Sequence, residues 1–420
     1  MAGENTVSTE VAKAASVEAT VIAAARASYG RLVALLAARD GDLAASEDAL
    51  SEAFAAALQA WPTRGIPANP DAWLLTTARN RLINAHRHEA VKLRGIDEIL
   101  RRMYAPSAAH EPIPDQRLAL MFVCAHLAIQ EDVRTPLMLQ TILGLDAAQI
   151  ASAFLISPTT MGQRLVRAKA KIKAAGIGFK IPDLDALPAR LEDVLSAIYA
   201  AFGTSFDAVA GSDDQNVSLA EEAIFLARLV VALMPQEPDA LGLLALMLYI
   251  DARTPARGGA EDPFIPLKQQ DATLWERDKI IEAEGLLVRA SKLKRLGRFQ
   301  IEAAIQSIHV QAPITGATNW AALRSFHELL LTHRPSIGAY VSYAAVLQAM
   351  GQGQAALEVL FSLEAADVSQ YQPYWVTLAA AHRVCGDDTA TMAAMDRAIG
   401  LTENPKVRAF LLRERAAGSV

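Results

Sequence analysis

The sequence predicts an all-α protein, and three features of its 420 residues support this fold class. Apolar residues recur at spacings of three and four from Val21 onward, which is the period of an amphipathic helix, and no alternating run of five or more residues indicates a strand. Alanine supplies much of the 52% hydrophobic fraction, whereas aromatic residues contribute only 6%. Small side chains of this kind favour closely packed helices over sheets rich in Val, Ile and Tyr.

Prolines and glycines divide the helical pattern into blocks. Three prolines between the first two blocks resist regular helix, and the segment GIGFKIPDLDALP, with two glycines and two prolines, marks a second boundary. We therefore expect a tail over 1–19, a helical domain over 20–95, a linker over 96–114, a second helical domain over 115–178 and a helical C-terminal domain over 179–420.

Charge is distributed unevenly along the chain. The net charge is -6, but residues 1–182 contain 20 basic and 17 acidic side chains, whereas residues 183–420 contain 20 and 29. A mildly basic first half suits a polyanionic partner, and the acidic second half suits a different task. The sequence thus predicts two parts with different functions.

Several classes of protein are disfavoured by the composition. Cys124 and Cys385 are too far apart in sequence to indicate a disulfide framework or a cysteine-based metal site. The longest apolar run, Ala240–Ile250, has 11 residues against the roughly 20 that span a bilayer, and the N-terminus is acidic where a signal peptide would be basic. We expect a cytoplasmic protein without membrane contact, without a cofactor and without a metal site.

The sharpest local signal is the segment DAAQIASAFLISPTTMGQRLVRAKAKIKAA. Asp146 is suited to cap a first helix, Ser157 to cap a second, and Pro158 to the first position of that second helix. The segment therefore predicts a helix-turn-helix motif. The second helix would bury one apolar stripe and expose a polar and basic face, and no acid occurs from Thr159 to Lys180. The predicted buried stripe is Met161, Leu165, Ala168 and Ile172.

A DNA-binding helix would use this basic face in two ways. Lysine and arginine displace counterions from phosphates, and polar side chains near the helix start reach base edges in a major groove. A solvated basic face on a structural helix is the alternative interpretation. The caps, the short turn and the missing acids together favour DNA.

A second candidate helix begins at the segment NPDAWLLTTARNRLINAHRH, where Asn69 is suited to the cap and Pro70 to the first helical position. The preceding segment, WPTRGIPANP, is predicted to be a loop. It contains Arg64 and Trp61, whose ring can stack on a splayed base. By its spacing alone, Trp73 favours a core position over stacking on a base. The predicted buried stripe is Trp73, Leu74, Ala78, Leu82 and Ala85, and the predicted outward face is Arg79, Asn80, Asn84 and Arg87.

Acidic residues precede that helix in the segment SEDALSEAFAAALQAW. The spacing of Glu47, Asp48 and Glu52, beside Phe54, places acids on one helix face suited to a basic partner. Acids near a helix N-terminus also need no partner, because they interact with the helix dipole.

Other constellations give weaker signals. His86 and His88 are two residues apart and cannot share a helix face, so they do not indicate a metal site. The segment YIDARTPARGG lies between two predicted helices, and its Asp251, Arg253 and Arg257 are compatible with a partner contact or with a structural Arg–Asp pair.

The acidic half contains two similar segments that each read as a helix pair. Gly351 and Gly386 occupy the predicted turns and are 35 residues apart, close to the 34-residue period of tetratricopeptide repeats. Pairs of this kind cannot bury their apolar faces alone, so stacked units are expected. The matching positions are Tyr340, Ala344 and Ala356 in the first segment and Trp375, Ala379 and Ala398 in the second.

These segments, in this order, resemble an RNA polymerase sigma factor of the extracytoplasmic-function type. The acidic segment resembles the part of region 2 that docks on the polymerase clamp helices, the NPDAW segment resembles the part that melts and reads the -10 element, and Asp146–Lys173 resembles the region 4 helix-turn-helix that reads the -35 element. The segments IPDQRLALMFVCAH and DARTPAR are similar to the subgroup with a C-terminal tetratricopeptide-like extension. The chain departs from the family at His86 and His88 and at CAHLAI, where CCHPAL is usual.

The resemblance implies a function and a set of site residues. It implies a factor that directs core RNA polymerase to promoters, is not an enzyme, contacts the beta-prime clamp helices and the beta flap, and is open to a regulator protein at its C-terminal domain. A tetratricopeptide scaffold with a helix-turn-helix module, acting as a conventional transcriptional regulator, is the alternative. The implied site residues are Asp48, Glu52 and Phe54 for polymerase, Arg64, Trp73, Arg79, Asn80, Asn84 and Arg87 for the -10 element, and Thr159, Thr160, Gln163, Arg164, Arg167 and Lys171 for the -35 element.

Overall fold

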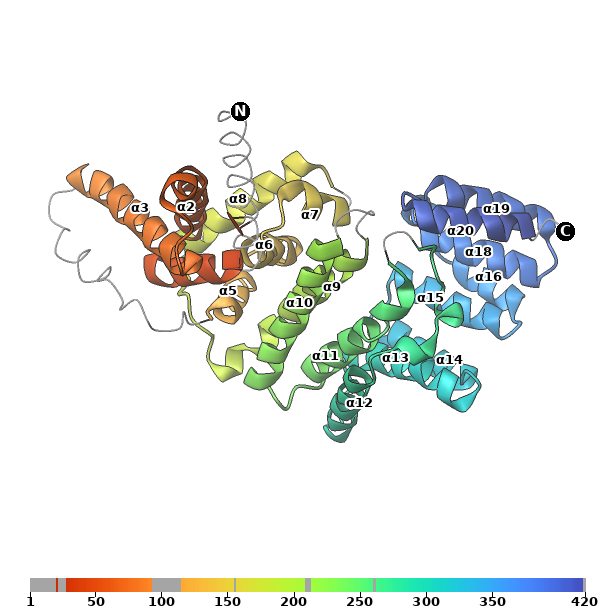
Figure 1. Cartoon of the computed structure of the whole chain (residues 1–420). Helices are drawn as coiled ribbons and strands as arrows, with labels where there is room; N and C mark the ends of the chain where they lie inside the picture. Colours follow the sequence, from red (N-terminus) through yellow and green to blue (C-terminus); the bar gives the residue numbers. More distant parts are fainter. Residues whose placement is uncertain are drawn as a thin grey trace, which may run out of the picture. The chain divides into compact units, whose positions relative to one another are not determined.

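The computed structural model describes residues 20–21, 28–92, 115–154, 156–207, 213–259 and 262–417. These residues form α-helices and short 3-10 turns with no strand among them, which confirms the predicted all-α fold (Figure 1). The chain divides into two compact units, Met1–Thr204 and Ser205–Val420. The predicted tail over 1–19 and linker over 96–114 lie outside the described residues.

The first unit contains two helical groups, one over residues 28–92 and one from residue 115 onward. They contact each other where α2 meets α8 and where the helix over 28–40 meets the end of α6. Gly30 makes one of these contacts possible, because a Cβ at this position would lie 1.9 Å from the backbone oxygen of Ile142 at the end of α6. Residues 28–40 are helical, and the helices that follow are α2 (Leu43–Arg64), α3 (Pro70–Lys92), α5 (Arg117–Cys124), α6 (Glu131–Leu143), α7 (Ala147–Ala153), α8 (Pro158–Ala174) and, after the 3-10 turn Leu184–Ala186, α9 (Pro188–Asp207).

Helix α9 packs on the first unit rather than starting the second. Arg134 Nη1 on α6 donates to Asp193 Oδ2 at 2.8 Å, and Arg190 Nη1 donates to the backbone oxygen of Phe122 at 3.1 Å. Residues 179–204 therefore belong to the first compact unit, although the sequence suggests a boundary after residue 178. That boundary remains a proposal about the domains, whereas Thr204 is where the compact unit ends.

The second unit is built from helices and three 3-10 turns that follow one another along the chain. Helix α11 contacts α10, α12 and α13, and the later helices pack mainly on their neighbours in sequence. The α-helices are α10 (Asp213–Leu233), α11 (Pro238–Asp251), α12 (Arg277–Lys292), α13 (Arg298–Thr315), α14 (Trp320–His333), α15 (Ile337–Ala349), α16 (Gly353–Phe361), α17 (Ala365–Val368), α18 (Gln372–Val384), α19 (Asp388–Gly400) and α20 (Pro405–Ala417), and the 3-10 turns are Thr254–Arg257, Leu267–Gln269 and Ala272–Leu274.

The apolar run Ala240–Ile250 becomes helix α11, which is buried on all sides from Ala240 to Tyr249. A helix that is hydrophobic all round needs neighbours on every face. Gly242 allows the closest of these approaches, since a Cβ there would lie 2.4 Å from the backbone nitrogen of Gln300 on α13. The longest apolar run of the sequence is thus the core helix of the second unit.

The two predicted C-terminal helix pairs are α15 with α16 and α18 with α19. Gly351 and Gly386 lie in the turns with φ of 78° and 75°, a conformation that glycine adopts without steric cost. The small residues predicted at the crossings, Ala344, Ala356, Ala379 and Ala398, are fully buried. This helix-pair geometry agrees with the predicted pattern, and the assignment to tetratricopeptide repeats stays a prediction.

The polar residues Asp251, Arg253 and Arg257, predicted as one cluster, each bind a different partner in the structure. Asp251 Oδ2 accepts from Lys279 Nζ at 2.7 Å, whereas the buried Arg253 donates from Nη2 to Gln306 Oε1 at 2.8 Å. Arg257 donates to the backbone oxygen of Ile250 at 3.2 Å. Arg253 therefore holds helices together, and its burial argues against a direct contact with a partner protein.

We expect acid to destabilise the second unit, because His327 on α14 is buried. Burial, followed by the charge of His309, lowers the pKa of His327 from 6.5 to about 4. The folded state therefore favours the neutral ring, whereas the unfolded chain takes up a proton near pH 6.5. The free energy of unfolding has its full value above pH 6.5 and falls as the pH is lowered from 6.5 towards 4. We expect a loss of about 2–3 kcal/mol in the free energy of opening α14, measured by hydrogen exchange of the full chain.

The variants His327→Leu and His333→Gln test this expectation. Leu at position 327 cannot titrate and should reduce the pH dependence of the opening free energy of α14, obtained from exchange rates corrected for the intrinsic rate at each pH. Replacing the exposed His333 on the same helix should leave that dependence unchanged. An unaltered pH dependence in His327→Leu would show that another group is responsible.

Candidate nucleic-acid and polymerase interface

The helix-turn-helix predicted from the sequence is formed by α7 and α8. Ser157 Oγ accepts from the backbone N–H of Thr160 at 3.1 Å, and Pro158 is the first residue of α8. Asp146 Oδ1 accepts from the backbone N–H groups of Ala148 and Gln149, each at 2.8 Å, at the start of α7. Both predicted caps are confirmed: Asp146 fixes the start of α7, and Ser157 fixes the start of α8 after the turn.

Helix α8 has an apolar face in the core and a basic face towards solvent. The predicted apolar stripe is confirmed, because Met161, Leu165 and Ile172 are 1% exposed and Ala168 is 5% exposed. On the other side Arg164 is half-buried, and its Nη1 donates to Asp132 Oδ2 on α6 at 2.9 Å. The remaining residues predicted for the -35 element are exposed: Thr159, Thr160, Gln163, Arg167 and Lys171.

Two lysines on α8 pair with acids of α2 and its N-cap, the first largely buried and the second 65% exposed. Lys169 Nζ forms a largely buried ion pair with Glu47 Oε2, their side chains being 11% and 10% exposed, and Lys173 Nζ lies 2.7 Å from Asp42 Oδ2. Burial raises the pKa of the Glu47 carboxyl, against the opposite effect of Lys169. Although burial also raises the pKa of Asp42, hydrogen bonds from Lys173 and Ala45 outweigh it and lower that pKa.

The acidic face of α2 differs from the one predicted. Glu47 is 8% exposed and points to α8, so the expectation that it shares a face with Asp48 and Glu52 was wrong. Asp48 and Glu52 are exposed, as expected for residues one helical turn apart. Glu52 Oε2 accepts from Arg81 Nη1 on α3 at 2.8 Å, and Phe54 is half-buried beside them in sequence.

Helix α3 starts as predicted. Asn69 Oδ1 accepts from the backbone N–H of Ala72 at 3.0 Å, and Pro70 is the first helical residue. The predicted buried stripe is confirmed at Leu74, Ala78 and Leu82, but it was wrong at Ala85, which is exposed.

The residues predicted for the -10 element differ in exposure. Trp73 is half-buried and meets the buried Trp61 edge to face, with ring centroids 5.5 Å apart. Arg79 was predicted to face out but is half-buried, and burial, followed by the charge of Arg39, lowers its pKa. The other members of the set are exposed: Arg64, Asn80, Asn84 and Arg87.

The remaining titratable candidates have local partners or are buried. His86 Nε2 lies 2.7 Å from Asp40 Oδ1, and the side chain of His88 lies outside the described residues. Burial raises the pKa of the Cys124 thiol to about 12, which keeps it protonated. Within the described parts of the chain, no three His, Cys, Asp or Glu residues gather closely enough to hold a metal ion.

Comparison with known proteins places this geometry in a family. Residues 25–91 match the model of Sigma-70 region 2, and residues 119–172 match the model of Sigma-70, region 4. An uncharacterized protein of Rhizobium meliloti (strain 1021) is 34% identical over 385 residues, which cover 89% of each chain. The chain belongs to the sigma-70 family. It is a sigma factor of the extracytoplasmic-function type, and residues 190–291, within its C-terminal extension, match a family of unknown function (DUF6596).

The two matched regions assign the structural groups described above. Region 2 contains α2 and α3, and region 4 contains α5 to α8, so the chain has the parts by which sigma factors act in promoter recognition with core RNA polymerase. No solved structure matches the chain. Across its described residues, this sigma factor has no helix that is both long enough and apolar enough to span a membrane.

Proposed function

We propose that this sigma factor brings core RNA polymerase to promoters by reading a -35 element with α8 and a -10 element with α3 and the end of α2, where Arg64 lies. The -35 contacts are assigned to the exposed face of α8. The -10 contacts are assigned to the six residues named from the resemblance, of which Trp73 and Arg79 are the least exposed.

The observation that carries this proposal is the division of α8 into two faces. Four apolar residues anchor the helix in region 4, while Arg167, Lys171 and Gln163 stay exposed on its other side. A recognition helix needs both properties, since it is held rigidly by its motif and inserts its free face into the major groove. A helix-turn-helix in a scaffold protein would share this feature, but the region 2 match favours the sigma factor.

Polymerase binding is assigned to the exposed acidic face of α2. Asp48 is the cleanest residue to test, because Glu52 also pairs with Arg81 on α3. We expect Asp48→Lys to weaken binding to core RNA polymerase about fivefold to tenfold, since it places like charges on the two sides of a charged interface. Co-purification of tagged sigma factor with core polymerase measures the effect.

The matched control is Asp185→Lys, which makes the same charge change at an exposed position of the same unit outside α2. It should leave the recovered polymerase unchanged. Equal recovery with Asp48→Lys and the wild type would remove the acidic face of α2 from the interface.

Reading both elements requires the contact between α2 and α8 to open. Elements centred at -10 and -35 are about 25 base pairs apart, or about 80 Å along B-form DNA. A compact unit of about 200 residues has a radius of gyration of only about 17 Å. We therefore propose that the ion pairs of Lys169 and Lys173 with α2 belong to the polymerase-free protein.

The second unit is proposed as a regulatory or interaction domain. Its helix pairs and its core helix α11 form a folded body of their own, with many exposed charges along its surface helices. This assignment is independent of the contacts that regions 2 and 4 make.

A further inference from the structure

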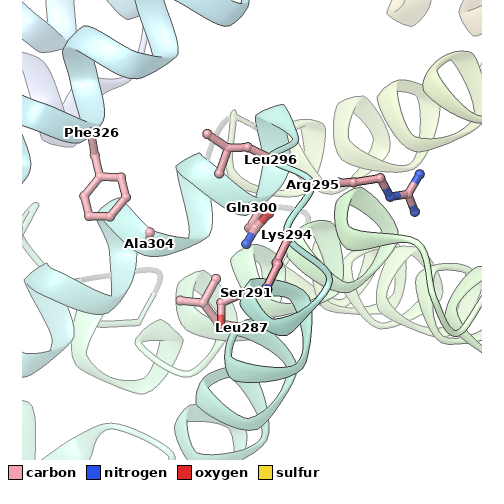
Figure 2. Close-up of a pocket in the computed structure, with 8 residues that line it drawn as sticks. All are labelled: Leu287, Ser291, Lys294, Arg295, Leu296, Gln300, Ala304 and Phe326. Atoms are coloured by element: carbon pink, nitrogen blue, oxygen red, sulfur yellow. The ribbon is translucent and has the colours of Figure 1, made fainter.

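The second unit contains a pocket of about 440 Å³ between α12, α13 and α14. Figure 2 shows Phe326, Leu296 and Leu287 around one space, which Ala304 also lines. A volume of this size is in the range of small-molecule sites, which are mainly apolar with a few placed polar groups. The pocket therefore has the size and the lining of a binding site for a small molecule.

One polar side chain of the lining has an unmet hydrogen-bonding group. Gln300 is 7% exposed, and its Oε1 has no hydrogen-bond partner. A buried polar group left unpaired costs free energy, typically about 1–3 kcal/mol. Rotation about the last side-chain bond exchanges the two ends of the amide, so either end can be turned towards a bound molecule.

The backbone around Gln300 is held firmly in place. Gln300 is in the first turn of α13, where Asp239 Oδ1 on α11 accepts from the backbone N–H of Phe299 at 2.8 Å. Gly297 makes room for this cap, because a Cβ there would lie 2.1 Å from Asp239 Oδ1. The contact between α11 and α13 thus holds the backbone of Gln300 at the pocket.

One lysine places a positive charge at the rim of the pocket, whereas the neighbouring arginine is held by other groups. Lys294 lines the pocket, is exposed, and has a φ of 53° in the left-handed region. Arg295 also lines the pocket but extends away from it in Figure 2. Its Nη2 donates to the backbone oxygen of Gln236 at 2.9 Å and to Glu237 Oε2 at 3.2 Å.

We propose that this pocket binds a small organic acid. Its aromatic or aliphatic body fills the apolar space between Leu287, Ala304 and Phe326, its anionic group lies at the rim near Lys294, and a hydrogen-bonding group on the body meets the Gln300 amide. The site is separate from the residues assigned to polymerase and DNA. Binding is therefore testable without any measurement of transcription.

Two fluorescent probes separate the apolar and the anionic requirements. 8-Anilinonaphthalene-1-sulfonate carries two aromatic groups, an N–H donor and a sulfonate, whereas N-phenyl-1-naphthylamine has the same rings and donor without the charge. The full-length chain should bind the sulfonate saturably at one site. The chain should bind the sulfonate probe about twofold to fivefold more tightly than the neutral probe, as expected for one exposed charge pair.

Variants locate the site. Ala304→Trp fills the pocket and should weaken both probes at least about tenfold, and Leu287→Trp does the same from α12 if the first variant fails to fold. Lys294→Glu should remove the preference for the sulfonate and leave the neutral probe unchanged. Lys292→Glu, at the exposed end of α12 outside the lining, is the matched control and should change neither affinity.

Two results would overturn the proposal. If both well-folded tryptophan variants bind the probes as the wild type does, the probes bind elsewhere and the pocket is not their site. If the two probes bind equally well to the wild type and to Lys294→Glu, the pocket is a neutral groove of the kind that takes apolar side chains of a partner protein, and the organic-acid assignment is wrong.

Discussion

Replacing Arg167 and Lys171 together by Glu should lower promoter-directed transcription about thirtyfold or more. Both residues are exposed on the same side of α8, one helical turn apart. Each lost contact to a base or phosphate costs about 1–3 kcal/mol, and reversed charge adds repulsion from the DNA backbone. Run-off transcription with reconstituted polymerase measures the loss, and co-purification with core polymerase should be unchanged.

The variant avoids Arg164 for a structural reason. Arg164 donates to Asp132 on α6, so its replacement by Glu would create repulsion inside region 4 and confuse folding with DNA binding. Lys292→Glu with Arg413→Glu gives the same change in net charge at exposed positions outside regions 2 and 4 and should leave transcription unchanged. If the Arg167 and Lys171 variant transcribes as well as this control, α8 is not the -35 reader.

Replacing Lys169 by Ala should destabilise the first unit by about 3 kcal/mol. The substitution leaves the Glu47 carboxylate buried without its cation, and losing one partner of a buried ion pair typically costs about 3–5 kcal/mol. The second oxygen of Glu47 already has no hydrogen-bond partner, so no other group compensates. Hydrogen exchange of α2 and α8 in the full chain should become about 100-fold faster.

A double replacement distinguishes the loss of the ion pair itself from the burial of a single unpaired charge. Glu47→Leu with Lys169→Met removes both charges and keeps apolar volume, so we expect stability within about 1 kcal/mol of the wild type. Lys180→Ala is the control for a lysine without a role between the helices, since Lys180 is exposed beyond the end of α8. Wild-type exchange rates in Lys169→Ala would mean that the contact between α2 and α8 does not depend on this pair.

Local signals in the sequence predicted three helix starts correctly, but not the end of α2, which continues through Trp61 to Arg64. Ser157, Asn69 and Asp146 cap the helices they were expected to cap, because a cap depends only on residues two or three positions away. The apolar stripe of α8 could also be predicted from the sequence, since a period of 3.6 residues fixes which side chains share a face.

The errors concern partners that are distant in sequence. Lys169 and Glu47 are 122 positions apart, so nothing near Glu47 signalled that it would turn to α8 while its neighbour Asp48 stays exposed. Arg79 is half-buried, and the charge of Arg39, 40 positions earlier, contributes to lowering its pKa.

The pocket of the second unit was beyond prediction for the same reason. Its lining comes from α12, α13, α14 and the loop between the first two, and only the folded unit brings Leu287 and Phe326 to one space.

The most direct test of the central claim is to sequence the 5′ ends of transcripts made by core polymerase on genomic DNA, with and without this sigma factor. We expect new start sites that share sequence elements about 10 and about 35 base pairs upstream, and a footprint over these elements that requires core polymerase. An absence of new start sites, together with protection of duplex DNA by the chain alone, would contradict the account and favour a conventional DNA-binding regulator.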